Sequence, residues 1–234
     1  MNANIVITDK ILVIAPHADD ESIGCGGLLA LYGPQCDLLL LTDGRKGHTK
    51  SEYSDENKLV EIRKKEFTAV GRIAKVRNIF FLNIEDGKMA QKRAELMRIN
   101  IKSYDYIFVP NRYESHLDHK VVYGIVNKMK KLQKAKANIY EYEVWTPLRH
   151  PTWFLPITSV YEVKKRMIAQ HISQLADIDY VSKGMALSCY RGAFINEEYA
   201  EAYAFADYSG LKKMIYGMLP KYMKNIIKKR LYKH

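Results

Sequence analysis

The chain has 234 residues, of which 47% are hydrophobic and 27% are charged. This length suits one large domain or two small ones, and the composition excludes wholesale disorder. Since no apolar run approaches the ~18 residues that a membrane-spanning helix needs, the sequence also predicts no transmembrane segment.

The N-terminus and the cysteines indicate a reducing compartment. The chain does not open with a basic segment followed by an apolar one, so we expect no signal peptide. The three cysteines, Cys25, Cys36 and Cys189, form no C-x-x-C pair. An odd number of isolated cysteines argues against a disulfide framework, and we therefore expect a cytoplasmic protein.

The net charge of +11 is concentrated at the C-terminus. Residues 210–234 contain eight Lys and Arg and no Asp or Glu, which leaves +3 on residues 1–209. We therefore expect residues 1–209 to form one domain and residues 210–234 to form a separate basic tail.

Short apolar runs alternate with helical patterns along the chain. The apolar runs predict buried strands over 11–15, 36–42, 78–82, 106–110 and 138–145. Helical patterns extend over 22–32, 56–74, 88–101, 119–132 and 162–175. This alternation predicts an α/β fold, with a Rossmann-like, mostly parallel sheet and helices on both faces. Functional sites in such sheets form where the carboxyl ends of strands meet loops.

A dense polar motif, Pro-His-Ala-Asp-Asp-Glu, follows the first strand directly at 16–21. His17 and Asp20 are three positions apart, and a tight turn into a helix can direct both side chains to one point. An imidazole nitrogen and a carboxylate oxygen suit zinc or a similar divalent ion. Asp19 would point into the same cavity without binding the ion. Alternatively, these acids simply cap the next helix and complement its dipole.

A second motif, His116-Leu-Asp118-His119, occupies the equivalent place after the strand 106–110. By itself it is also consistent with a surface loop that has two solvated histidines and Asp118 as a helix cap. Two such loops at one sheet edge are a stronger signal than either alone, because three of the seven His in the chain lie in them. His17, Asp20 and one of His116 or His119 would make three ligands and leave a position open for water, which is typical of catalytic zinc.

Both motifs resemble those of the LmbE-like (PIG-L) family of zinc-dependent N-acetylglucosaminyl deacetylases. That family has P-H-P-D-D-E after its first strand and H-x-D-H later, and the likeness covers roughly residues 10–208. Weaker matching segments lie at 24–27, 42–44, 63–66, 86–89, 142–147 and 170–174. Ala18 replaces the usual second proline, a change that removes no ligand.

The resemblance implies a role for each residue of the two motifs. Three would bind the metal, zinc or alternatively ferrous iron: His17, Asp20 and His119. Asp19 would be the general base that activates water. His116 would face the developing oxyanion as a cation held by Asp118.

The substrate contacts that the resemblance implies lie outside the two motifs. Arg63 and Asp86 would contact sugar hydroxyls, and His171 would take a role in the pocket. Arg45 stands where many family members have glutamate, so contacts near it would differ. Trp145 suits either a sugar subsite or the core, with core packing favoured.

The implied function is removal of the acetyl group from an N-acetylated sugar, with lipid-linked and nucleotide-linked N-acetylglucosamine as candidate substrates. One alternative is an amidase that acts on a small-molecule or thiol conjugate with the same site. Another is a non-catalytic protein that tethers membrane or nucleic acid, against which the intact motifs argue.

The basic tail has apolar residues at helical spacing among its lysines, including Leu211, Met214, Ile226 and Ile227. A basic amphipathic segment suits an anionic membrane surface, which would make the protein peripheral at the inner face of the membrane. Alternatively, the tail docks its apolar face on the body or on another subunit, so an oligomer stays possible. No RNP1-like motif is present, and we expect no nucleic-acid partner.

Overall fold

A computed structural model describes residues 5–6, 8–47, 53–176 and 178–206. The predicted basic tail, 210–234, lies outside these residues. Within them, no helix is both long enough and apolar enough to cross a bilayer.

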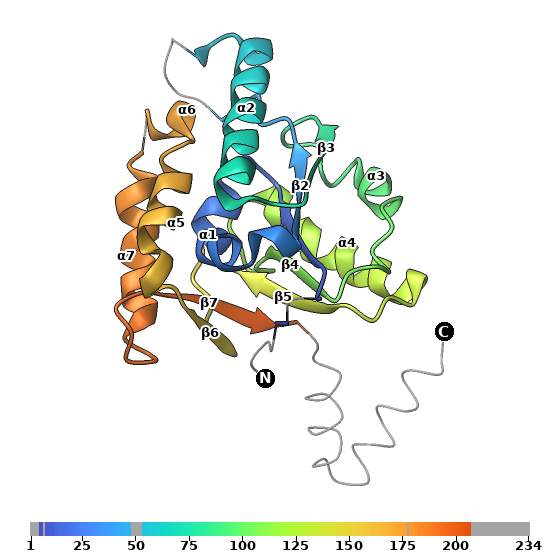
Figure 1. Cartoon of the computed structure of the whole chain (residues 1–234). Coiled ribbons are helices and arrows are strands. Elements are labelled where there is room, and N and C mark those ends of the chain that lie inside the picture. The colour runs from blue at the N-terminus through green and yellow to red at the C-terminus, as the bar shows by residue number, and fades with distance from the viewer. Residues whose placement is uncertain (1–4, 7, 48–52, 177, 207–234) are drawn as a thin grey trace, which may run out of the picture.

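The core of the fold is a seven-stranded sheet in the order β3-β2-β1-β4-β5-β7-β6 (Figure 1). The strands are β1 (Ile11–Ala15), β2 (Cys36–Thr42), β3 (Asn78–Ile84), β4 (Tyr106–Pro110), β5 (Asn138–Tyr142), β6 (Trp153–Pro156) and β7 (Ala200–Phe205). The first five are parallel, while β7 runs antiparallel to both β5 and β6. The mostly parallel α/β sheet predicted from the sequence is confirmed.

Helices cover both faces of the sheet (Figure 1). They are α1 (Asp20–Tyr32), α2 (Glu56–Ala74), α3 (Arg93–Met97), α4 (Leu117–Gln133), α5 (Tyr161–Ile168), α6 (Ile172–Leu175) and α7 (Tyr180–Gly192). Alternate residues of β1 enter opposite cores: Val13 packs with residues of α1 and α2, and Ile14 packs with residues of α4. Such two-sided burial explains why the central strands are apolar throughout.

Two predicted helices are interrupted. The segment 88–101 forms only the short α3, and the stretch before it runs in turns, where the Asp118 carboxylate accepts hydrogen bonds from the backbone N–H groups of Gly87 and Met89. The segment 162–175 is divided into α5 and α6 by a turn at 169–171.

The first helix packs unusually close to the sheet because of its glycines. An ideal Cβ on Gly24 would lie 2.2 Å from Cδ2 of Tyr142, and one on Gly27 would lie 2.3 Å from Cγ2 of Ile157. The sequence therefore permits a close approach that places the start of α1, and Asp20 with it, directly over the end of β1.

Candidate metal centre and active site

The loops after β1, β2, β3 and β4 meet at the carboxyl edge of the sheet and enclose a cavity of about 520 Å³. We call it the active-site cavity. Its lining includes His17, Asp19, Asp20, Arg63, Asp86 and His116. The two motifs predicted to converge are thus brought together from opposite sides of one cavity.

One atom from each of the three predicted metal ligands contributes to a compact triangle at the base of this cavity. Nδ1 of His17 lies 3.1 Å from Nε2 of His119, and Oδ2 of Asp20 lies 3.1 Å from that Nε2 and 3.6 Å from that Nδ1. Ligands at the ~2.0–2.1 Å bond lengths of tetrahedral zinc are about 3.3 Å apart. The three atoms therefore fit a divalent ion, and the buried, hydrogen-bonded Asp20 is held in place by the backbone N–H of His17 at 2.8 Å.

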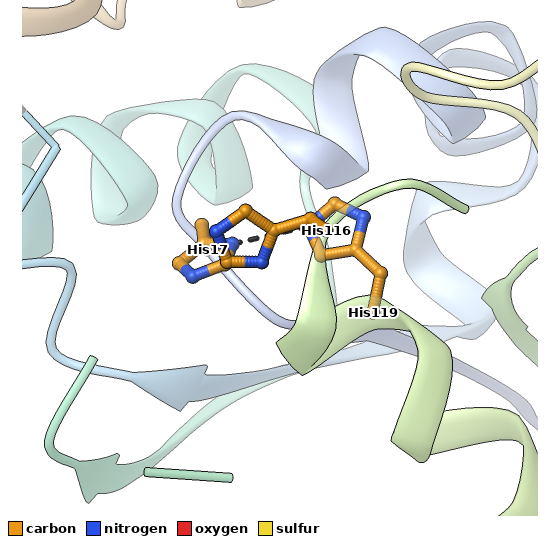
Figure 2. A group of neighbouring side chains, drawn as sticks. All are labelled: His17, His116 and His119. Carbon is orange, nitrogen blue, oxygen red and sulfur yellow. Dashed lines mark hydrogen bonds between the residues drawn. The ribbon is translucent and has the colours of Figure 1, made fainter. Parts of the chain in front are cut away.

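The imidazole of His116 lies beside the same centre. Figure 2 shows His116 and His119 side by side at the start of α4, with the ring of His17 approaching from the loop after β1. Ring nitrogens of His17, His116 and His119 all lie within 4.8 Å of one another. A ring nitrogen of His17 and carboxylate oxygens of Asp86 and Asp118 form a second group of atoms that lie within 4.8 Å of one another.

The far nitrogen of His17 faces two carboxylates. Its Nε2 lies 3.1 Å from Oδ1 of Asp86 and 3.6 Å from Oδ2 of Asp118. Burial opposes protonation, but hydrogen bonds to Asp118, Asp20 and Asp86 outweigh it and raise the pKa of His17 well above its ordinary value. A carboxylate behind a ligand imidazole fixes the ring and increases its basicity, a common arrangement in metal sites.

Asp19 is buried and its backbone is strained. Its φ of 143° lies in a region that L-residues rarely adopt, and its Oδ2 lies 3.5 Å from Nη2 of Arg63. Burial raises the pKa of Asp19 to about 6, although the charge of Arg63 opposes the change. A strained, buried carboxyl in a polar cavity is a common feature of functional sites.

The contacts of His116 differ from the arrangement expected from the resemblance. Nδ1 of His116 accepts the backbone N–H of Asp118 at 3.3 Å, while the Asp118 carboxylate binds the backbone of Gly87 at 2.8 Å. Burial, followed by the charges of His17 and His119, lowers the pKa of His116. These surroundings favour a neutral ring whose Nε2 is left to face the cavity.

The predicted substrate contacts fall in different places. Arg63 lines the cavity but is buried and donates to the carbonyl oxygens of Ala18, at 2.7 Å, and Gly44, at 3.1 Å. Arg45 instead pairs with Asp43, at 2.7 Å from Nη2 to Oδ2. In the loop after β2, Lys46 and Gly47 line the active-site cavity, whereas Arg45 does not.

His171 lies behind the cavity wall. Its Nε2 is 2.8 Å from Oε1 of Glu21, and its side chain is almost fully buried. Burial opposes protonation, but the charge and hydrogen bond of Glu21 raise the pKa of His171. The charge of His171 lies close enough to lower the pKa of Asp19, but neither His171 nor Glu21 lines the active-site cavity.

Several lining residues were not singled out by the sequence. Gln174 and Tyr180 face the cavity, and so does Trp145, for which core packing was favoured. Gln174 and Tyr180 come from segments after β5 that only the three-dimensional fold brings over the cavity. Trp145 was the last residue of the strand predicted over 138–145, but β5 ends at Tyr142 and leaves Trp145 in the loop after it.

Comparisons with known proteins agree with this geometry. A diacetylchitobiose deacetylase of Thermococcus kodakarensis is 28% identical over 190 residues, which are 72% of this chain and 71% of the relative. The solved N,N'-diacetylchitobiose deacetylase of Pyrococcus horikoshii superposes with a TM-score of 0.72 at 25% identity, over 83% of this chain and 82% of that one.

The same fold also supports other chemistry. GalB of Pseudomonas putida, a 4-carboxy-2-hydroxymuconate hydratase, matches with a TM-score of 0.71 at 20% identity, over 86% of this chain and 97% of that one. The family described as PIG-L, GlcNAc-PI de-N-acetylase, matches residues 12–130. This match spans both motifs, and the chain therefore belongs to the PIG-L family of deacetylases.

Proposed function

We propose that the protein is a zinc-dependent hydrolase that removes the acetyl group from an N-acetylglucosamine-type sugar. The observation that supports this most directly is the triangle of His17 Nδ1, Asp20 Oδ2 and His119 Nε2 beside a buried Asp19. His17, Asp20 and His119 would hold the ion, and three protein ligands with one position for water are typical of catalytic zinc sites. Ferrous iron is the alternative metal for the same donor set.

A zinc ion at these atoms supplies Lewis acidity, which polarises the acetyl carbonyl and lowers the pKa of water. Asp19 takes a proton from the attacking water and later returns it to the leaving amine. Its raised pKa, about 6, suits both proton transfers near neutral pH. Arg63 donates a hydrogen bond to the carbonyl oxygen of Ala18 and so holds the turn in which Asp19 lies.

His116 is placed to stabilise the charge that develops on the acetyl oxygen. With Nδ1 engaged by the Asp118 N–H, its Nε2 is the atom available to donate a hydrogen bond to an oxyanion. The Asp118 carboxylate accepts hydrogen bonds from the backbone N–H groups of Gly87 and Met89 and so orders the part of the cavity lining that contains Gly87. Loss of one oxyanion donor reduces kcat by about 10²–10³-fold in other hydrolases.

A panel of acetylated substrates tests the reaction. The full-length protein, loaded with zinc, is incubated with N-acetylglucosamine, lipid- and nucleotide-linked N-acetylglucosamine and an N-acetylated thiol conjugate, and free amine and product mass are measured. We expect loss of one acetyl group from a sugar substrate. Turnover of the thiol conjugate alone favours the amidase alternative, and no turnover with metal bound favours a non-catalytic role.

Two variants separate metal binding from chemistry. Asp19→Asn should keep zinc and reduce kcat by about 10²–10⁴-fold, because it removes a general base and no ligand. His17→Ala should lose zinc and activity together. Deacetylation at the wild-type rate by metal-free His17→Ala would refute the assignment.

We further propose that the protein is cytoplasmic and binds an anionic membrane surface through the basic tail, 210–234. The last described residue, Ala206, lines a groove of about 360 Å³ together with Lys130, Lys131 and Lys134. The groove lies at the amino edge of the sheet, along the C-terminal half of α4. Lys130 lies 11 positions after His119 on this helix, so roughly 16 Å of α4 separates the groove from the metal centre. A membrane bound there would leave the active-site cavity facing the solvent.

Vesicle sedimentation tests this partner. The full chain should sediment with vesicles that contain phosphatidylglycerol, but not with phosphatidylcholine alone, and less at high salt. Combined Lys228→Glu, Lys229→Glu and Arg230→Glu substitutions should abolish the binding, while Lys58→Glu and Lys65→Glu on α2 should not. Unchanged binding of the tail variant would refute the tail's role.

A further inference from the structure

A second cavity, of about 200 Å³, lies next to the active-site cavity. We call it the side compartment. The residues that line it include Ile23, Val144, Trp145, Tyr180, Lys183 and Leu187. Since Trp145 and Tyr180 also line the active-site cavity, these two rings form a boundary common to both spaces.

The boundary rings are held by the surrounding structure. Their centroids lie 5.1 Å apart in an edge-to-face arrangement. The fully buried carboxylate of Glu114 accepts the backbone N–H groups of Val144, at 3.0 Å, and Trp145, at 3.1 Å. Tyr180 is the first residue of α7, whose N-terminus is capped by Asp179 through Ser182 at 3.0 Å. Trp145 and Tyr180, at the boundary that the two cavities share, are therefore preorganised.

The side compartment differs chemically from the active-site cavity. Ile23, Val144 and Leu187 are aliphatic, and Lys183 is the one charged residue in its described lining. A second hydrophilic sugar would leave several hydroxyl groups there without partners, which is unfavourable once water is displaced. An apolar group makes no such demand and gains from burial.

The rim of the active-site cavity is also partly apolar. Leu117 lines that cavity although 74% of its surface is exposed, and Trp145 is 42% exposed. Exposed apolar side chains at a pocket mouth often mark a binding surface. Since drug-sized ligands occupy roughly 300–1,000 Å³, the side compartment has room for one ring or a short alkyl chain.

We propose that the side compartment binds an apolar aglycone, attached to the N-acetylated sugar whose acetyl group lies at the metal centre. This inference rests on the proposed deacetylase function and specifies its substrate class. It also sets the chain apart from relatives named for diacetylchitobiose, because it predicts an aryl or alkyl glycoside, and not a second sugar, as the preferred substrate.

Three substrates test the preference: N-acetylglucosamine, its phenyl β-glycoside and N,N'-diacetylchitobiose. The zinc-loaded full chain should deacetylate the phenyl glycoside with a kcat/KM at least about tenfold above that of either other substrate, as expected for an apolar group that fills a pocket. Leu187→Gln should remove most of this preference, mainly through KM. Leu132→Gln makes the same change at an exposed position of α4 outside both cavities and should retain it.

Binding to the zinc-loaded Asp19→Asn protein gives a readout independent of turnover. The dissociation constant for the phenyl glycoside should be at least about tenfold below that for N-acetylglucosamine, and Leu187→Gln in the same background should remove the difference. Turnover without any preference for the phenyl glycoside overturns the inference but leaves the deacetylase function intact. Selective binding of the phenyl glycoside with no turnover of any substrate would overturn the deacetylase function but leave the apolar binding site intact.

Discussion

Nδ1 of His17 and Nε2 of His119 lie 3.1 Å apart although 102 positions separate them in the chain. The two nitrogens meet because β1 and β4 are neighbouring parallel strands, so the loop after β1 faces the start of α4. Asp20 completes the triangle from the first turn of α1. Parallel strand order thus brings two short motifs together into one cluster, which we propose as the set of metal ligands.

Removal of one imidazole should therefore release the metal. We expect His119→Ala to contain no zinc after dialysis and to be inactive, because two donors cannot hold the ion against competing buffer ligands. His150→Ala removes an exposed histidine and should retain both zinc and activity. Elemental mass spectrometry of the dialysed proteins makes the measurement, and zinc retained by His119→Ala would contradict the assignment.

Asp86 offers a sharper test, since two roles are open to it. Its Oδ1 lies 3.1 Å from Nε2 of His17, whereas the family resemblance implies contact with sugar hydroxyls. If it acts through His17, Asp86→Asn should weaken zinc binding by about 10–100-fold. Competition with a chromophoric chelator measures this affinity. A raised KM with unchanged zinc affinity would instead assign Asp86 to the substrate.

The elements closest to the site were predictable because their signals are local. Continuous apolar runs define β1, β2 and β4. The first motif follows β1 directly and the second follows the loop 111–115 after β4, so their places in the sequence already predicted that both lie at the carboxyl edge of the sheet. The Gly-rich start of α1 has a low helix propensity, so its helical form depends on packing against distant residues such as Tyr142 and Ile157.

The rest depends on contacts between distant segments. The four residues of β6 and the alanine-rich β7 become strands only through pairing with each other and with β5. Between β3 and β4, the turns at 87–89 bind the Asp118 carboxylate of α4, a contact that no local sequence pattern predicts. Trp145 is apolar enough for a core, and only the fold determines that it lines a cavity.

Asp37 predicts how stability depends on pH. At the start of β2 its carboxylate accepts two hydrogen bonds from Arg77, at 2.9 and 2.7 Å, and one from Tyr104 at 2.8 Å. Burial opposes ionisation, but these hydrogen bonds outweigh it and lower the pKa of Asp37. Its contribution to stability is therefore present above the unfolded pKa of about 3.9, and is lost as pH falls through the lower folded pKa.

Asp37→Asn should accordingly lower the free energy of unfolding at pH 7 by about 2 kcal/mol. The difference from wild type should shrink as pH falls below about 4, because the unfolded carboxyl then binds a proton while the native one does so only at lower pH. Urea denaturation of both proteins across this range measures the difference, which cancels the titration of other groups. A difference that stays constant down to pH 3 would rule out this ion-pair explanation.

Two glycines in helices predict opposite effects of the same substitution. In Gly24→Ala the new Cβ would lie 2.2 Å from Cδ2 of Tyr142 and 2.7 Å from the carbonyl oxygen of Glu143. Tyr142 cannot move away readily, because its hydroxyl donates to the Ile14 carbonyl oxygen at 2.8 Å. We expect a loss of about 1–3 kcal/mol in the free energy of unfolding.

Gly124, on α4, is the matched control, since its Cβ would meet no described atom within 4 Å. Gly124→Ala should stabilise the protein by roughly 1 kcal/mol through helix propensity alone. Because Gly24 lies one turn beyond Asp20, the strain in Gly24→Ala should also displace that ligand and weaken zinc binding, which Gly124→Ala should leave unchanged. Urea denaturation measures the stability of each variant, and competition with a chelator measures its zinc affinity. Equal stabilities of Gly24→Ala and Gly124→Ala would mean that α1 does not pack as closely on Tyr142 as described.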